Sequence, residues 1–327
     1  MLRYTIQNPL LPASFTAMKD SMAPQIICIG ELLIDLISTE YAADFASADT
    51  YQRLPGGSPA NLAMNLARLG RQVELVATVG QDDAGGLLLN AVRKAGVGTT
   101  AIRRVPEPTT LILVTKSQEV SDFEPYRLAD RLISKEQLSE APLTSAKVLH
   151  TTAFALSVEP ARTAILQALQ EGEAAGARVS VDYNYADKIW SGDRAAGLEV
   201  FQELCKLSPL VKLSDVDYAR LFDKEITDRA AAAGEVLDLG ADTVVVTLGG
   251  EGCYVAREGE AFQLPARLVE VVDTTGAGDA FWSGFLAAYV TDFSLEDCAK
   301  AGRAMAERKL SRLGPVLERL TVEDLLS

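Results

Sequence analysis

The sequence VDTTGAGDAFWSG at residues 272–284 decides the fold. The β-branched run 268–272 leads into it and predicts a strand, and the small, apolar stretch 280–288 predicts a buried helix. A glycine turn that enters a helix leaves backbone N–H groups unpaired at the positive end of the helix dipole. Turns of this kind bind anions, so we predict a strand–turn–helix unit with an anion site at its centre.

Asp279 lies at the mouth of this predicted anion site. A carboxylate beside a group of N–H donors can accept a proton from a hydroxyl while the donors hold the charge that develops during phosphoryl transfer. A carboxylate in the first turn of a helix can equally be a helix cap. The turn alone leaves both interpretations open.

A second glycine turn opens a helix earlier in the chain. Residues 55–61 have the sequence PGGSPAN, and residues 62–70 have the apolar spacing, alanine content and terminal glycine of a helix. The pair Gly56–Gly57 allows a small polar ligand to contact bare backbone, and Asn61 offers both a donor and an acceptor. We therefore expect a second ligand site here.

Asp35 is a carboxylate among leucines and isoleucines, shortly after the predicted first core strand at residues 25–30. A carboxylate in apolar surroundings needs hydrogen-bond partners, and sugar hydroxyls are suitable ones. The alternative is a surface residue on an alternating strand.

The remainder of the chain alternates between strands and helices, which predicts a mainly parallel, doubly wound α/β sheet flanked by helices. Predicted strands span residues 73–80, 148–152, 179–182, 210–214 and 243–247, with helices at 83–95, 160–172 and 193–206 and a helical pair at 295–313. Segments 39–55 and 106–127 break this rhythm and predict a small β lid over the sites. We expect a flexible N-terminal tail at residues 1–24 and one domain at 25–327.

Composition excludes several classes of function. The net charge of −14 argues against nucleic acid or an anionic membrane as a partner. No apolar run approaches the ~20 residues of a membrane span. The four cysteines are far apart in the sequence, which favours reduced thiols and the cytoplasm. His150 is the only histidine, so a Ser-His-Asp hydrolase or a histidine-rich metal site is disfavoured.

The sequences GGSPAN at 56–61 and DTTGAGD at 273–279, in this order and at this separation, resemble the ribokinase-like (PfkB) sugar kinase family. The resemblance extends over almost the whole chain from residue 25. Residues 30–35, 58–61 and 126–130 are most similar to the fructokinase branch. The resemblance implies a ribokinase-like fold.

The family's functional residues can be transferred to matching positions of this sequence. The resemblance implies that Asp279 is the general base and that an anion hole is formed by the N–H groups of Gly276, Ala277 and Gly278. Sugar hydroxyls would be held by Asp35, Gly56, Gly57 and Asn61, with Tyr126 and Arg127 reaching in from the lid. The nucleotide would contact Thr247, Gly249, Gly252, Asn184 and Lys188. Asp217 would organise Mg²⁺ through water.

Three positions depart from the family pattern. The family's Asn-x-x-Glu appears as SDVD at 214–217, and its Asp-Pro-Asn-x-Arg appears as DYNYA at 182–186, without the arginine. Lys188 is the nearest replacement for that charge. The adenine-side asparagine is also missing from the segment 301–304.

We therefore expect an ATP- and Mg²⁺-dependent kinase of a free ketohexose, with fructose as the first candidate. One alternative is a 2-dehydro-3-deoxygluconate kinase in which Arg127 pairs with the substrate carboxylate. Another is a non-catalytic regulator that binds a sugar or a nucleotide. A dinucleotide-dependent oxidoreductase is disfavoured, because no G-x-G-x-x-G follows the first strand. The family also leads us to expect a homodimer formed through the lid.

Overall fold

The largest element of this computed structural model is a nine-stranded sheet. In spatial order its strands are β13 (Glu260–Leu264), β12 (Cys253–Arg257), β11 (Thr243–Thr247), β10 (Leu210–Ser214), β9 (Arg178–Asp182), β8 (Val148–Thr152), β1 (Ile26–Ile29), β4 (Val73–Gly80) and β5 (Ile102–Val105). All pairs from β11 to β5 are parallel, and β12 and β13 are added antiparallel at one edge. The mainly parallel sheet is thus confirmed.

The structure describes residues 24–116 and 122–327. The predicted tail at 1–24 lies outside these residues except for its last position. No helix within the two described ranges is long and apolar enough to cross a membrane.

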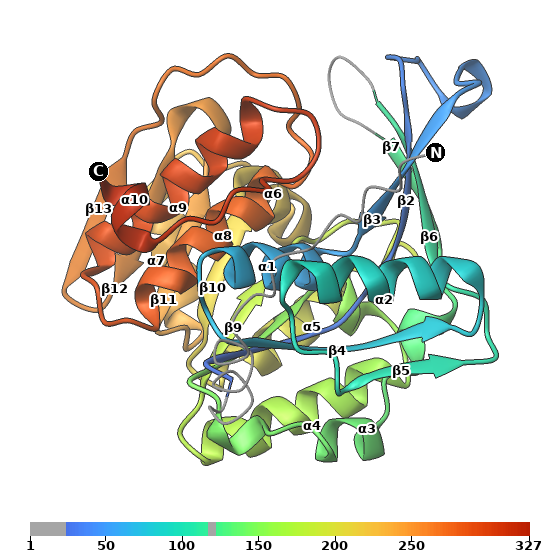
Figure 1. Cartoon of the computed structure of the whole chain (residues 1–327). Helices are drawn as coiled ribbons and strands as arrows, with labels where there is room; N and C mark the ends of the chain where they lie inside the picture. The colour runs from blue at the N-terminus through green and yellow to red at the C-terminus, as the bar shows by residue number, and fades with distance from the viewer. Residues whose placement is uncertain (1–23, 117–121) are drawn as a thin grey trace, which may run out of the picture.

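Helices cover both faces of the large sheet because its buried strand residues point alternately to opposite sides. In β1, Ile27 and Ile29 pack into one core cluster, and Ile26 and Cys28 pack into the other. The first face is covered by α3 (Lys135–Ser139), α4 (Ala161–Ala174), α5 (Arg194–Cys205), α6 (Asp215–Phe222) and α7 (Arg229–Asp238). The second is covered by α1 (Ser58–Arg68), α2 (Asp83–Ala95), α8 (Ala277–Tyr289), α9 (Leu295–Leu310) and α10 (Val322–Leu326) (Figure 1).

The strand order reverses at β1, which has β4 on one side and β8 on the other. In open parallel sheets, ligands bind outside the carboxyl ends of the strands near such a reversal. Here the chain leaves β1 through Gly30 and Glu31, and β8 and β9 end at Thr152 and Asp182. This edge of the sheet is therefore where the predicted site residues are expected to gather.

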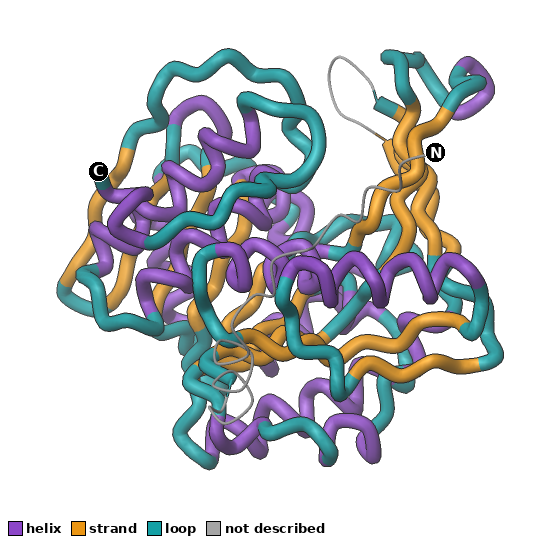
Figure 2. Tube along the Cα trace, in the orientation of Figure 1, coloured by secondary structure: helices purple, strands orange, loops and turns teal. Residues whose placement is uncertain are grey.

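A second sheet of four strands stands apart from the helix-covered body (Figure 2). Its order is β3 (Tyr51–Gly56), β2 (Leu33–Ser38), β6 (Leu111–Thr115) and β7 (Asp122–Tyr126). The segments predicted as a lid supply β3, β6 and β7, although residues 117–121 lie outside the described part. β2, which carries Asp35, also belongs to this sheet because it pairs with both β3 and β6.

Two predictions about secondary structure are wrong. Residues 268–272 form an irregular segment in which Leu268 is fully exposed and Val271 and Val272 are more than half exposed. β-Branched residues favour a strand only where a neighbouring strand and a buried face are available. Residues 268–272 have neither, because the large sheet ends at the edge strand β13. The predicted helical pair at 295–313 is the single helix α9, which ends at Leu310 shortly before Gly314 and Pro315.

Candidate active site

The predicted anion turn is present at the start of α8. Gly276 caps the helix with φ of 75°, a left-handed conformation that favours glycine, and Asp279 lies in the first helical turn. The Ala277 amide donates to the Thr274 carbonyl at 3.1 Å. The amides of Gly276 and Gly278 have no acceptor within the described residues. The turn therefore offers N–H donors at the positive end of the helix dipole.

The Asp279 carboxylate points to α1. The Ser58 hydroxyl donates to Asp279 Oδ1 at 2.6 Å, and the Asn61 side-chain amide donates to Oδ2 at 2.9 Å. The N-terminus of α8 has no side-chain cap. Asp279 is therefore not the cap of its own helix, and it joins the starts of α1 and α8.

Asp35 approaches the same point from the second sheet. An added Cβ at Gly56 would lie 2.0 Å from Asp35 Oδ2, so this glycine is needed to make room for the carboxylate. Burial raises the pKa of Asp35 to about 7, and the nearby negative charge of Asp279 adds to this shift. Near neutral pH, Asp35 can therefore either accept a hydrogen bond from a ligand hydroxyl or donate one to it.

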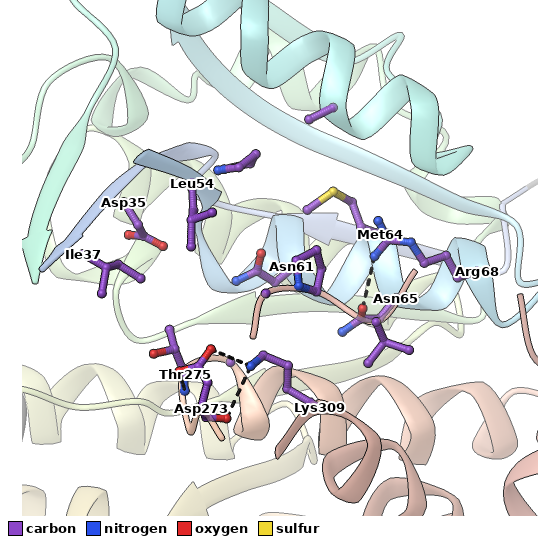
Figure 3. A pocket seen from close by; sticks show the side chains of 16 residues that line it. Asp35, Ile37, Leu54, Asn61, Met64, Asn65, Arg68, Asp273, Thr275 and Lys309 are labelled. Carbon is purple, nitrogen blue, oxygen red and sulfur yellow. Dashed lines mark hydrogen bonds and ion pairs between the residues drawn. The ribbon is translucent and has the colours of Figure 1, made fainter. Parts of the chain in front are cut away.

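A cavity of about 240 Å³ extends from these residues along α1. Asp35 and Asn61 line one end of it, Arg68 lines the other, and Thr275 and Lys309 line the side formed by the anion turn (Figure 3). Its α1 residues are Asn61, Met64, Asn65 and Arg68, a spacing that places them on one face of the helix. The cavity is thus a groove along α1 that starts beside Asp279.

Lys212 and Asp182 form a buried ion pair beneath the anion turn, a feature that sequence reasoning did not assign to the site. The ammonium lies 2.9 and 2.8 Å from the two carboxylate oxygens, and an added Cβ at Gly278 would be 2.8 Å from Lys212 Nζ. Burial raises the pKa of Asp182 to about 6, although Lys212 opposes this shift. For Lys212, burial works against the charged form but the surrounding carboxylates outweigh it, so the pKa is raised. The signal available in the sequence was a charged residue within each of two largely apolar strands, Asp182 in β9 and Lys212 in β10.

Glu31 was also missed. Its carboxylate accepts from the Ser58 amide at the start of α1 and from the Thr152 hydroxyl at the end of β8, both at 3.0 Å. Burial raises the pKa of Glu31 to about 8. The signal was an acidic residue directly after the first buried strand. Glu31 fixes the start of α1, and Ser58 and Asn61 extend from there to Asp279.

Four of the five predicted nucleotide residues lie at or just after the carboxyl ends of β11 and β9, and the fifth, Lys188, contacts the second sheet. Thr247 pairs in register with Ser214, and Gly249 and Gly252 form the turn between β11 and β12. That turn connects two antiparallel strands, so the geometry of the β-hairpin also accounts for its glycines without a ligand. The Asn184 side-chain oxygen Oδ1 accepts from the Phe154 backbone amide at 3.3 Å. The Lys188 ammonium lies 2.8 Å from Asp122 and 2.6 Å from Glu124, both on β7, and so connects the body to the second sheet.

The predicted lid residues differ in their surroundings. Tyr126 ends β7 and is 51% exposed. The Arg127 guanidinium donates to Asp130 at 2.6 Å, to the Phe154 carbonyl at 3.0 Å and to the Ser157 hydroxyl at 2.8 Å, and it stacks on the Phe154 ring. Its donors are therefore largely occupied by the protein itself.

Asp217 is placed beside the Lys212–Asp182 pair. Its Oδ2 accepts from the Ser214 amide and hydroxyl at 2.8 and 2.7 Å, which fixes the start of α6. Burial raises the pKa of this carboxyl, while Lys212 and Ser214 oppose the shift. The described residues contain no group of three or more His, Cys, Asp or Glu side chains that could enclose a metal. A magnesium ion carried on nucleotide phosphates needs only one or two carboxylates and water, and the second oxygen of Asp217 fits that need.

Comparison with known proteins agrees with this geometry. The sequence model described as pfkB family carbohydrate kinase matches residues 23–319. An ATP-dependent 6-phosphofructokinase of Thermoanaerobacterium thermosaccharolyticum is 33% identical over 299 residues, which cover 91% of this chain and 92% of that protein. The chain is thus similar over nearly its full length to this kinase.

Solved structures show the same architecture. The fructokinase of Halothermothrix orenii is 32% identical with a TM-score of 0.76, and the match covers 89% of this chain and all of that one. An uncharacterised sugar kinase of Pyrococcus horikoshii in complex with ATP is 25% identical with a TM-score of 0.80, over 92% of this chain and 97% of that one. The predicted ribokinase-like fold is confirmed.

Proposed function

The chain belongs to the pfkB family of carbohydrate kinases, and from this premise we propose that it transfers the γ-phosphoryl group of ATP to a hydroxyl of a free ketohexose, with fructose as the preferred acceptor. The observation that carries the proposal is the position of Asp279. This carboxylate lies between the groove lined by Asp35 and Asn61 and the free amides at the start of α8. An acceptor hydroxyl and a phosphoryl group can therefore meet at one base.

In the proposed mechanism, Asp35 and Asn61 orient the acceptor and Asp279 takes the proton from its hydroxyl. The amides of Gly276 and Gly278 hold the charge on the transferring group, and the Lys212 ammonium adds positive charge beneath them. Mg²⁺, when bound with the nucleotide near Asp217, neutralises phosphate charge. Positioning and charge stabilisation account for the chemistry, and no covalent intermediate with the protein is required.

The test is Asp279→Asn. We expect turnover to fall about 10²- to 10⁴-fold because the base is lost, while nucleotide binding measured by calorimetry persists. Asp292→Asn is a matched control, since it makes the same change at an exposed position just beyond α8. A wild-type protein that binds ATP and sugar without turnover would favour the non-catalytic regulator instead.

Acceptor identity is tested by ATP consumption with fructose, other hexoses and 2-dehydro-3-deoxygluconate. We expect fructose to be used best. The sugar-acid alternative required Arg127 to pair with a carboxylate. Its Nε and Nη1 donors already bind Asp130, Phe154 and Ser157, and its charge is paired with Asp130, although Nη2 makes no hydrogen bond within the described residues. Preference for the acid, with selective loss in Arg127→Ala, would contradict the fructose assignment.

A phosphorylated ketohexose is the second candidate acceptor. The groove continues from Asn61 to Arg68. Within the described residues, the Arg68 guanidinium makes one hydrogen bond, of 3.5 Å to Asn65, so it has further donors for an anion. The Thermoanaerobacterium relative is named for 6-phosphofructokinase activity. Fructose 6-phosphate use that is lost in Arg68→Ala, with fructose use unchanged, would establish this candidate in place of the first.

A further inference from the structure

Lys309 is a buried lysine in the last turn of α9 whose ammonium faces the anion turn. Its side chain is 8% exposed, and Nζ lies 2.8 Å from Asp273 Oδ2. The same ammonium lies 3.4 Å from the Asp273 carbonyl oxygen (Figure 3). It also lies 3.4 Å from the Arg312 carbonyl oxygen. One cation is thus surrounded by a carboxylate and two carbonyl oxygens.

These contacts attach the anion turn to the end of α9. Asp273 begins the turn, and its other carboxylate oxygen accepts from the Thr275 amide at 3.0 Å. Burial alone would raise the pKa of Asp273, but Lys309 and Thr275 hold it below its usual value. The Val272 amide also donates to the Leu310 carbonyl at 2.8 Å. The conformation of residues 272–275 therefore depends on groups from α9.

Lys309 is also close to the proposed base. An added Cβ at Gly276 would lie 3.9 Å from Lys309 Cε and 3.8 Å from Asp279 Oδ2. Both side chains therefore flank the residue that starts α8. A displacement of the turn would move the amides and Asp279 together, and about 1 Å of misplacement can cost about 100-fold in rate.

We propose that Lys309 is a positioning residue whose ammonium serves as a built-in monovalent cation for the anion turn. The inference rests on the proposed kinase function. A buried ion pair is by itself weak evidence for stability, since apolar residues can often replace it. The ammonium acts here through geometry, because it gathers oxygens from the turn and from the end of α9 around one charge.

These oxygen ligands suggest a chemical-rescue experiment, in which a small cation added to the buffer replaces the ammonium of Lys309. Carbonyl and carboxylate oxygens also bind NH₄⁺ or K⁺ in place of water. Lys309→Ala would remove the ammonium and leave an oxygen-lined space for a small cation. We expect kcat to fall about 10- to 100-fold and NH₄Cl to restore it with saturation. Tetramethylammonium chloride at equal ionic strength should not restore it, because that cation is too large.

Two further variants are matched controls. Lys300→Ala, also on α9, removes a lysine that pairs only with Glu296 and Asp297 on the surface, so its kcat should remain normal. Lys309→Met fills the space with an apolar chain, so its kcat should fall without rescue. Normal turnover in folded Lys309→Met, or a Lys309→Ala loss that NH₄Cl and tetramethylammonium affect equally, would overturn the proposal.

A second readout needs no substrate. NH₄Cl should raise the melting temperature of Lys309→Ala more than tetramethylammonium chloride does, and the wild type should show no such difference. Absence of wild-type turnover on every sugar would refute the kinase proposal, whereas this cation-specific stabilisation would still test the role of Lys309. An equal effect of both salts on Lys309→Ala would refute that role.

Discussion

Asp35 and Asp279 are two carboxylates that share one groove. Asp35 comes from β2 of the second sheet, and Asp279 comes from α8 of the body. The negative charge of Asp279 contributes to the raised pKa of Asp35, so binding to one affects the other. A ligand hydroxyl placed between them would relieve this repulsion by donating its proton to Asp279 and accepting one from protonated Asp35.

The unfolding free energy of the ligand-free protein should depend on pH because of Asp35. Its folded-state pKa of about 7 lies above the usual 3.8, so the unfolded chain loses this proton first as the pH rises. The stabilisation that comes from protonated Asp35 is fully present below about pH 4 and is lost as the pH rises through about 7. Over this range the unfolding free energy falls by at most about 1.4 kcal/mol per pH unit. Asp35→Asn removes this dependence.

We therefore expect the difference in unfolding free energy between Asp35→Asn and the wild type to increase, in favour of the variant, by about 2 kcal/mol from about pH 5.5 to about pH 8. Urea unfolding at several pH values measures this difference. Glu258→Gln, at an exposed turn, controls for the loss of a surface carboxylate. A constant offset between Asp35→Asn and the wild type across this pH range would show that the Asp35 pKa is not raised.

Sequence patterns predicted some residues of the site and not others. Gly56, Asn61 and Asp279 stand in glycine-rich turns, where the residue types themselves indicate ligand contact. Lys309 stands in the run ERKL, an ordinary charged end of a helix. Its carboxylate partner, Asp273, is 36 positions away, and only tertiary structure shows that its ammonium is buried.

At the scale of elements, the site depends on two helices that begin at glycine turns. α1 starts after Gly57 and α8 after Gly276, both with positive φ. The two helix starts face each other across Asp279. Under the proposed function, α1 supplies Asn61 to the acceptor side and α8 presents the amides of its N-terminus to the phosphoryl group.

Gly276→Ala tests the backbone of the second turn. Alanine fits sterically, since the nearest atoms to an added Cβ are at 3.8 and 3.9 Å, but φ of 75° costs about 1 kcal/mol for a residue with a side chain. Gly70→Ala is a matched control with φ of 76° and no neighbour within 4 Å. Denaturant unfolding should show similar losses for both variants.

Only Gly276→Ala should reduce kcat, because only that turn presents amides to the phosphoryl group. Steady-state kinetics with saturating ATP and sugar measures this difference. Equal kcat values in the two variants would refute a catalytic role for the Gly276 turn.

Element prediction succeeded where the local pattern agreed with the environment. Strand 243–247 is buried on both faces and was predicted from its valines. The similar run 268–272 failed because residue type alone does not supply a neighbouring strand. Asp35 was placed correctly in an extended segment, but its membership of the second sheet depends on pairing with the distant β6.

At the scale of the whole molecule, the second sheet has two edge strands, β3 and β7. β7 is connected to the body through Lys188. In the connection between β2 and β3, Tyr41 is 66% exposed and Phe45 is 56% exposed. Exposed aromatic side chains beside an edge strand are typical of protein interfaces.

We propose that two copies associate through this sheet. Sedimentation velocity at micromolar concentration should show a dimer for the wild type and a monomer for Phe45→Glu, because a buried charge opposes association. Leu313→Glu is the control, since it changes a 62% exposed leucine elsewhere on the surface. A monomeric wild type would contradict the proposal.

The hydrogen bonds from Ser58 and Asn61 to Asp279 also govern when the site can form during synthesis. They join positions 221 and 218 residues apart. The acceptor side of the groove leaves the ribosome long before the residue that completes it. Under the proposed function, a nascent chain therefore lacks its general base until Asp279 has emerged.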